Sequence, residues 1–349
     1  MRLLDSTGPG LSRSGGAGPS DHKAVEIEGH VLMVPIFTHS SAFSPYAARL
    51  EVSGATLERN GKPLAKLRFT EIPRFYQGAT GDGVPYWKIA TLHAKDVLAT
   101  TVLQTCTRYG NRDTSCQFCA IGQSLASKTT IAQKTPAQLA EVAEAAVRLD
   151  SVQHMVMTTG TPATADRGAR VLRDAAKAVR QRVELPIQAQ CEPPQDFSWF
   201  ERLADGGVDS LGMHLEAVSQ QVRTKIMPGK AEVQLEYYFS AFEAAVKVFG
   251  RGQVSTYILA GLGDSEEEIL LACDELIAVG VYPFVVPFVP IAETPLQYHP
   301  QPDPAFLHSL LDGVAQRLSK AKMRASHIKA GCGRCGACSS LRPREAARA

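Results

Sequence analysis

Three cysteines in this chain have the types and spacing of cluster ligands. Cys106 is followed by nine residues, "TRYGNRDTS", and then by Cys116 and Cys119, which are separated by two residues. Thiolates grouped in this way in reduced proteins bind iron–sulfur clusters or zinc. Three thiolates can hold three irons of a 4Fe-4S cluster, which leaves the fourth iron for an external ligand. The gap contains Gly110 and Asn111, which favour turns, so the loop can return Cys106 to the pair.

A second group of cysteines lies in the tail of the sequence. Cys332, Cys335 and Cys338 follow one another at two-residue gaps among three glycines. Glycine lets a backbone wrap closely around a metal. We predict an auxiliary iron–sulfur cluster here, with zinc as the second interpretation. His327 is a candidate fourth ligand.

Zinc is also the alternative for the first group. Cys116 and Cys119 could form a zinc knot with two cysteines of the tail, and the chain would then be a zinc-stabilised binding protein without catalysis. We favour the cluster because zinc does not explain the pattern of strands and turns that follows the first group.

That following pattern resembles a known family. Phe118 lies inside the cysteine pair, "TTGTP" ends an apolar run, and "CEPPQDF", "HLE", "LAGLGDSEEEI" and "VPFVPIAETPL" follow in order. From about Thr101 to Leu296, the chain resembles the radical S-adenosylmethionine (SAM) superfamily, in the branch that contains biotin synthase and lipoyl synthase. The nine-residue gap departs from the three residues usual in that superfamily.

A narrower resemblance covers the surroundings of the first cysteine group. The string "LATTVLQTCTRYGNRDTSCQFCAIG", with "GGAGPSD" and "GVPYWKIATLH" before it, resembles an uncharacterised radical SAM family whose genes accompany nitrilases. It implies a role in nitrile or nitrogen metabolism.

The resemblance implies a reaction. A 4Fe-4S cluster on Cys106, Cys116 and Cys119 would bind SAM at its open iron and cleave it reductively to a 5'-deoxyadenosyl radical. That radical would abstract hydrogen from a small-molecule substrate, and a reductant such as flavodoxin or ferredoxin would supply the electron. Auxiliary clusters serve as the sulfur source in lipoyl and biotin synthases, so sulfur insertion is the alternative reaction. An electron relay and substrate ligation fit the tail group equally well.

The resemblance also implies the contacts of SAM. Thr159 and Gly160 would offer backbone to the amine, Glu192 and Glu216 would bind the ammonium or the ribose, and Arg223 would bind the carboxylate. The alternative for these charged residues is a pair of solvated acids and a surface salt bridge. No residue is assigned a catalytic role, and His214, two residues before Glu216, is expected to be a core histidine.

The pattern of apolar residues predicts an α/β fold. About six strand–helix repeats indicate a parallel sheet with right-handed crossovers, and hence a partial TIM-like (β/α) barrel. Its functional residues are expected at the C-terminal ends of the strands. Asn60-Gly61 predicts a hairpin, and Thr135 predicts the start of a helix. The four predicted parts are a flexible arm (1–22), a β-rich module (23–100), the radical SAM barrel (101–296) and a Cys-rich extension (297–349).

Composition restricts the partners and the compartment. The chain has 349 residues, 44% of them hydrophobic, and a net charge of +2 from well-mixed charges, which argues against nucleic acid as a partner. It contains no stretch of the length of a signal peptide or a membrane span. We therefore expect a cytoplasmic protein with a small-molecule partner and no membrane association. Cys191 and Cys273 are expected to be buried hydrophobes without a role.

Overall fold

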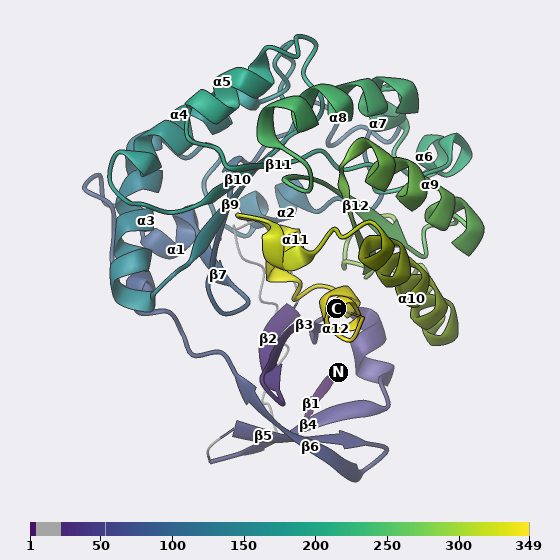
Figure 1. Ribbon diagram of the computed structural model, residues 1–349. Coiled ribbons are helices and arrows are strands. Elements are labelled where there is room, and N and C mark those ends of the chain that lie inside the picture. The colour runs from purple at the N-terminus through teal and green to yellow at the C-terminus, as the bar shows by residue number, and fades with distance from the viewer. Residues whose placement is uncertain (5–21, 53, 349) are drawn as a thin grey trace.

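The protein is described here by a computed structural model that covers residues 1–4, 22–52 and 54–348 (Figure 1). Its strands form two sheets. The larger has seven strands in the order β13-β12-β11-β10-β9-β8-β7, and the smaller has six in the order β1-β4-β5-β6-β2-β3. The predicted α/β class is confirmed.

The larger sheet forms a partial barrel. Strands β8 to β13 are parallel, and each pairs with the next along the chain, while β7 runs antiparallel at one edge. Six parallel strands match the repeats that the sequence predicts. The strands are β7 (Thr91–His93), β8 (Val97–Leu103), β9 (His154–Thr159), β10 (Ile187–Gln190), β11 (Ser210–Gly212), β12 (Val254–Ala260) and β13 (Tyr282–Pro287).

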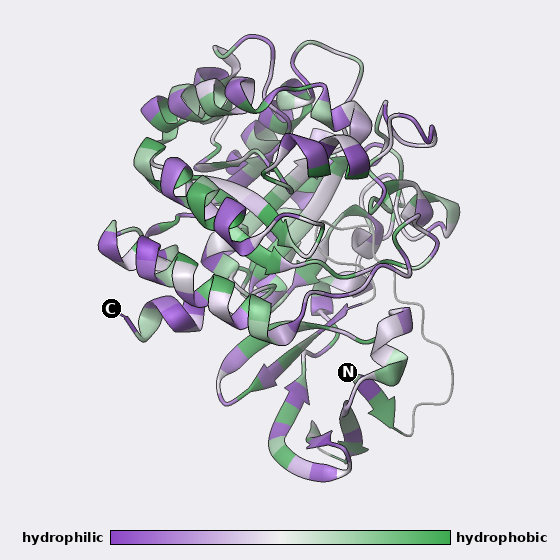
Figure 2. Cartoon of the chain, turned by 90° about the vertical axis from the view of Figure 1, so that its right-hand side faces the viewer, coloured by the Kyte–Doolittle hydropathy of each residue, from purple (hydrophilic) through white to green (hydrophobic). Residues whose placement is uncertain are grey.

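Helices cover the outside of this sheet, and the short helix α11 lies on its inner side (Figure 1). The helices alternate hydrophobic and hydrophilic residues (Figure 2), because one face packs on the strands and the other meets water. The helices are α1 (Tyr86–Ile89), α2 (Ile121–Ala126), α3 (Pro136–Asp150), α4 (Ala169–Arg180), α5 (Trp199–Asp205), α6 (Gln220–Ile226), α7 (Pro228–Ala231), α8 (Leu235–Phe249), α9 (Glu266–Val279), α10 (Pro304–Lys320), α11 (Cys332–Cys335) and α12 (Leu341–Ala346).

The start of α3 shows how local sequence sets an element. Thr135 is the N-cap, as predicted, and its side chain accepts a hydrogen bond from the backbone N–H of Gln138 at 3.2 Å. The Gln138 side chain accepts one from the N–H of Thr135 in return, at 2.9 Å. This capping box fixes the helix that follows the triad region.

The smaller sheet is an antiparallel module with one parallel pair, β1 with β4. The hairpin predicted at Asn60-Gly61 joins β5 to β6, and both residues have the positive φ that this turn requires, 51° and 79°. Its strands are β1 (Arg2–Leu4), β2 (His22–Ile27), β3 (His30–Pro35), β4 (Tyr46–Glu51), β5 (Gly54–Arg59) and β6 (Lys62–Phe69).

The smaller sheet contacts the tail. The backbone N–H of Met33, in β3, donates to the carbonyl of Ala337 at 2.8 Å, and Figure 1 shows β2 and β3 beside α11. The smaller sheet therefore supports the cysteine-rich segment directly.

The structure describes only part of the predicted arm, residues 1–22. Arg2–Leu4 forms the strand β1 instead of an arm. Residues 5–21, with the string "GGAGPSD", lie outside the described residues. Among the helices that are described, none has both the length and the apolar character needed to span a membrane.

Candidate active site

The triad loop, residues 106–119, begins after β8 and ends before α2. Hydrogen bonds within the loop fold the nine residues between Cys106 and Cys116 into a compact turn. The hydroxyls of Thr114 and Ser115 donate to the carbonyl of Arg108, at 2.9 and 2.8 Å. The backbone N–H of Ser115 also donates to the carbonyl of Asn111, at 2.8 Å. The loop therefore folds back on itself over its nine-residue gap, as its turn-forming composition predicts.

The thiols of the loop lie near one another and are partly buried. Burial raises the pKa of Cys119 to about 11, and the neighbouring Cys106 adds to the rise. Burial also raises the pKa of Cys116, with further contributions from Glu216 and Cys119. Three thiols on one loop are a donor set that fits a 4Fe-4S cluster.

A different arrangement would suit a single ion. Among the residues that the structure describes, no three His, Cys, Asp or Glu side chains are grouped so that they could hold one metal ion. A 4Fe-4S cluster does not require such a group, because each of its thiolates binds a different iron.

Gly160, at the end of β9, allows a close approach of two backbone segments. Its N–H donates to the carbonyl of Leu103 at 2.8 Å, and a Cβ at this position would lie 2.7 Å from the carbonyl carbon of Thr105. Thr105 immediately precedes Cys106. The need for glycine therefore arises from the triad loop, and the SAM contact predicted for Thr159 and Gly160 stays a prediction.

Glu192, after β10, is buried and bound to the triad loop. Its Oε1 forms an ion pair with Arg108 and accepts a hydrogen bond from the hydroxyl of Thr161 at 2.8 Å. Its Oε2 lies 3.9 Å from Nη1 of Arg167 and has no hydrogen bond among the described residues. Glu192 is thus a fixed carboxylate with one oxygen available to a ligand, rather than a solvated acid.

Glu216 lies beyond the end of β11 in the left-handed region, with φ of 67°. This conformation is uncommon for a residue with a side chain and is often found at functional sites. Its carboxylate accepts from Nζ of Lys230 at 2.8 Å. Burial lowers the pKa of Lys230, but the charge of Glu216 and other neighbours raises it above its ordinary value, so Lys230 stays positively charged at neutral pH.

Arg223 does not have the environment of a ligand-binding residue. It is fully buried in α6, and its guanidinium donates to the carbonyls of Leu215 and Val233 at 3.0 and 2.9 Å. It also lies over the ring of Tyr238, 5.1 Å from the centroid. These contacts argue against the predicted bond to the SAM carboxylate, because the guanidinium already binds backbone carbonyls.

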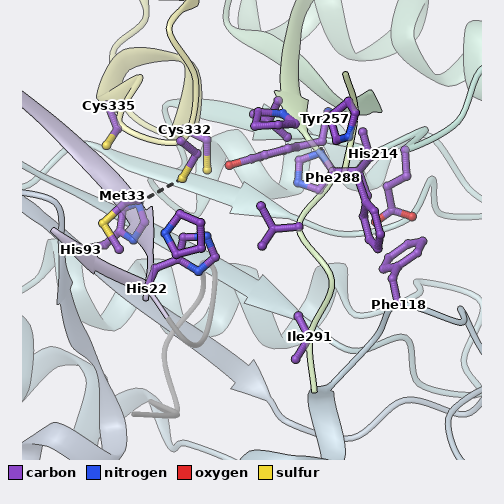
Figure 3. A pocket seen from close by; sticks show the side chains of 18 of the residues that line it. His22, Met33, His93, Phe118, His214, Tyr257, Phe288, Ile291, Cys332 and Cys335 are labelled. Atoms are coloured by element: carbon purple, nitrogen blue, oxygen red, sulfur yellow. Dashed lines mark hydrogen bonds between the residues drawn. The ribbon is translucent and has the colours of Figure 1, made fainter. Parts of the chain in front are cut away.

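A cavity of about 570 Å³ extends from Phe118, a residue of the triad loop, to the three tail cysteines. Figure 3 shows Phe118 and His214 at one end of it, and Cys332 and Cys335 at the other. Phe118 comes from the triad loop. The residues of interest in its walls are Phe118, His214, Glu216, Tyr257, His22, Met33, His93, Gln190, Cys332, Cys335 and Cys338.

The tail thiols are held by side chains of the barrel. Cys332 Sγ accepts a hydrogen bond from Nε2 of Gln190 at 3.2 Å and another from the Tyr257 hydroxyl. Cys338 Sγ lies 3.6 Å from Nε2 of His93. Burial raises the pKa of all three tail thiols, that of Cys335 to about 12, so a bound metal would be needed to keep them as thiolates.

His327 does not belong to this group. It lies in a short 3₁₀ segment, its side chain is exposed, and its carbonyl accepts a hydrogen bond from Gln253 at 2.9 Å. It is also absent from the residues that line the cavity, as far as the structure describes them. The exposed position of His327 therefore argues against this candidate for a fourth ligand. Cys191 and Cys273, by contrast, are buried as predicted.

His214 is more than a core histidine. Its Nδ1 accepts a hydrogen bond from the backbone N–H of Tyr257 at 3.2 Å, and burial lowers its pKa to about 3. The ring is therefore neutral, and its proton lies on Nε2. Nε2 is buried and has no partner among the described residues, so it is a donor in the cavity wall.

Several of these residues were not singled out by sequence. Arg108 lies inside the gap between the first two cysteines, and Lys230 follows the "MPG" after α6, so proximity to motifs could have suggested both. His93 and Tyr257 had no such signal. They contact the tail cysteines only because the fold brings distant segments together.

Residues 105–276, which contain the triad loop and strands β9 to β12, match the family described as the radical SAM superfamily. The chain therefore contains a radical SAM domain. The chemistry of this superfamily implies a 4Fe-4S cluster and SAM, which the triad donor set fits. The segments on either side of the match contribute β7, β8 and the tail cysteines.

Radical SAM enzymes are also among the relatives of this chain. It is 28% identical over 283 residues to bacteriochlorophyllide c C-7(1)-hydroxylase of Chlorobaculum limnaeum, covering 76% of this chain and 70% of that protein. It is 28% identical over 167 residues to lipoyl synthase of Geobacillus sp. (strain WCH70), covering 46% of this chain and 52% of that one. The chain is thus an enzyme, and it spans about half of the lipoyl synthase it matches.

The fold has a counterpart among solved structures. A radical SAM methyltransferase from Sphaerobacter thermophilus aligns with a TM-score of 0.50 and 14% identity, covering 78% of this chain and 75% of that chain. At this identity the likeness concerns the fold alone.

Proposed function

We propose that this chain is a radical SAM enzyme that acts on a small molecule held in the cavity between the triad loop and the tail. One observation carries the proposal. A single cavity of about 570 Å³ is bordered by Phe118, from the triad loop, and by Cys332, Cys335 and Cys338. A substrate there would lie between the two cysteine groups.

In this proposal Cys106, Cys116 and Cys119 hold the 4Fe-4S cluster to which SAM binds. The bound cluster and SAM supply the radical chemistry that removes hydrogen from an unactivated carbon. The chain's own contribution is enclosure. Apolar side chains of the barrel, such as Leu259 and Val286, line the cavity and would exclude water from a reactive substrate.

Two fixed carboxylates support the proposed SAM site. Glu216 lines the cavity and is held by Lys230, and Glu192, which is bound to the triad loop, has one oxygen without a hydrogen bond among the described residues. We assign these two carboxylates to the ammonium or ribose hydroxyls of SAM, which are donors that a carboxylate binds well. The backbone of Thr159 and Gly160 completes this proposed set.

We assign an auxiliary iron–sulfur cluster to Cys332, Cys335 and Cys338. Their two-residue gaps repeat the spacing with which three cysteines bind one 4Fe-4S cluster in bacterial ferredoxins. Their position on the cavity wall would bring such a cluster close to the substrate.

The relatives leave the substrate open. One relative is a hydroxylase and another is a lipoyl synthase, so we take from them only the radical SAM chemistry. The predicted link to nitrile or nitrogen metabolism has no counterpart among them and stays a prediction from the narrower resemblance.

The proposal is tested first by cleavage of SAM. Anaerobically reconstituted protein, given dithionite and SAM, should form 5'-deoxyadenosine, measured by liquid chromatography and mass spectrometry. Cys106→Ala, Cys116→Ala and Cys119→Ala should each abolish this product, because each removes a ligand of the cluster. The control is Cys273→Ala, which changes a buried cysteine of α9. Cleavage that survives in the Cys106 variant would show that another residue is the ligand.

A second test separates the two cysteine groups. The triple variant Cys332→Ala, Cys335→Ala and Cys338→Ala should still cleave SAM but should form no product from a substrate. Its iron content should fall by about four irons per chain. Unchanged iron, or zinc in place of iron, would show that the tail is a structural clasp.

Sulfur insertion is the rival reaction, favoured by the lipoyl synthase relative and by the tail thiols on the cavity wall. It predicts that product formation stops after the first turnover as the tail cluster is consumed. Sustained turnover with intact tail iron would exclude it.

A further inference from the structure

The tail motif supplies three thiols, and a 4Fe-4S cluster has four irons to be bound. The sequence contains eight cysteines. Three belong to the triad loop, three belong to the tail, and the other two are buried away from the cavity. Cys273 lies in α9, and Cys191 is beside Glu192. The fourth ligand of a tail cluster is therefore not a cysteine of this chain.

We propose that His93 is this fourth ligand. The inference rests on the auxiliary cluster proposed above. His93 is the last residue of β7, and its Nε2 lies 3.6 Å from Cys338 Sγ. In Figure 3 its ring lies at the cysteine end of the cavity, beside Met33. Imidazole nitrogen is an established ligand of iron–sulfur clusters in place of cysteine.

Three contacts fix the tail against strands β9, β10 and β3, and β7 belongs to the same sheet as β9 and β10. The N–H of Cys332 donates to Oε1 of Gln188, at 3.2 Å, and that of Gly331 donates to Nδ1 of His154, at 3.2 Å. A Cβ on Gly331 would overlap the side-chain amide of Gln188. With the bond from Met33 to Ala337, the tail is tied both to the barrel and to the smaller sheet. The position of His93 beside Cys338 is thus a product of the packing of three parts of the chain.

The other histidines are weaker candidates. His154 already uses Nδ1 for the tail backbone, His214 lies at the opposite end of the cavity (Figure 3), and His327 is exposed. His22 lines the cavity near His93 and is the rival that an experiment must exclude.

A histidine at the fourth iron would decide the role of the tail cluster. All four irons would have protein ligands, so the cluster could not bind substrate at an open iron. Its place beside the cavity would then serve electron transfer. Hydrogen bonds from Gln190 and Tyr257 to Cys332 would raise its reduction potential, as such bonds to cluster sulfurs do.

The experiment uses the full chain in which Cys106, Cys116 and Cys119 are alanine, so that only the tail can hold a cluster. After anaerobic reconstitution, iron and sulfide are measured, and the reduced cluster is examined by EPR and by pulsed EPR for nitrogen coupling. The expected result is a 4Fe-4S cluster with a strong imidazole coupling, which ¹⁵N labelling of histidine shifts. His93→Ala should lose the coupling and about one of the four irons.

Two further variants make the result specific. His93→Cys should restore the iron without the coupling, because a thiolate replaces the imidazole. His22→Ala should keep both. Coupling that survives in His93→Ala, or disappears in His22→Ala, would overturn the assignment to His93. If the triad variant does not fold, the same comparison is made in the chain with an intact triad. The signal of the tail cluster is then taken from difference spectra between wild type and His93→Ala.

Failure of the underlying cluster has a different signature. A chain without the triad that binds no iron, or binds zinc, would overturn the auxiliary cluster and this inference together. A chain that binds four irons but shows no nitrogen coupling would leave the cluster in place and overturn only the role of His93.

Discussion

The two ends of the cavity are built from different chemistry. The end near the triad loop has an ionic wall, because Glu216 lines it and is paired with Lys230, and a second ion pair, Glu192 with Arg108, joins the triad loop to the segment after β10. The tail end is neutral, with thiols that contact an imidazole, a phenol and an amide. An ionic end suits SAM, which carries several charges, and a neutral end with polar hydrogens suits the sulfurs of a cluster. The difference indicates a division of labour along one cavity.

Gly160→Val should produce the largest effect and should act on the triad end alone. The new side chain would overlap the backbone of Thr105, next to Cys106, because even a Cβ lies 2.7 Å from its carbonyl carbon. We expect a loss of about four irons per chain and of SAM cleavage, with the tail iron retained. Metal analysis and EPR check this. Gly81→Val is the control, since a Cβ there meets no atom closer than 4.0 Å. Full iron content with weakened SAM binding would instead support the direct SAM contact predicted for Gly160.

Lys230→Met tests the ionic character of the same end. Its side chain and that of Glu216 are 9% and 18% exposed, and removal of one partner of a buried pair costs about 3–5 kcal/mol. We expect the free energy of unfolding, measured in urea, to decrease by about 3–5 kcal/mol. The second substitution Glu216→Gln should recover part of this loss. Lys66→Met is the matched control: Lys66 pairs with Glu51 at the same distance, 2.8 Å, but on the surface, so little should change. If Lys230→Met and Lys66→Met lowered the free energy of unfolding equally, the buried pair would be no more important than the surface pair.

Arg223→Lys should give a smaller effect, on stability only. The guanidinium spans several backbone carbonyls that an ammonium group cannot reach together. Leaving buried carbonyls without a donor should lower the unfolding free energy by about 1–3 kcal/mol. SAM affinity of the folded variant, measured by calorimetry, should be unchanged. Arg170→Lys, at an exposed position, is the control. A large loss of SAM affinity without loss of stability would reinstate Arg223 as a SAM ligand.

The sequence predicted those parts of the molecule that short segments determine. The triad, the turn at Asn60-Gly61 and the cap at Thr135 each depend on residues within a few positions of one another. The parallel order of the strands followed from the regular repeats. These features could be expected because local spacing and local hydrogen bonds specify them.

The parts that were missed depend on long-range packing. His327 was a candidate ligand because it is close in sequence to the tail, whereas the structure brings His93 there from 245 positions before Cys338. Arg223 was assigned to SAM from its place after Glu216, but α6 turns its side chain into the core. The SAM contact of Gly160 stays a prediction, and the structure gives a separate reason for a glycine there. In each case the sequence did not show which distant segment of the chain packs against the residue.

The contact of Met33 with Ala337 has a consequence for the order of assembly. The three cysteines of the triad are synthesised within 14 residues of one another, so that loop can receive its cluster early. The tail site needs β3 and β7 from the early part of the chain and cysteines made much later, and closure of so long a loop is slow. If the tail binds the proposed second cluster, we therefore expect the protein to be loaded in two stages. An intermediate with the first cluster present and the second absent is then the form that iron starvation should accumulate.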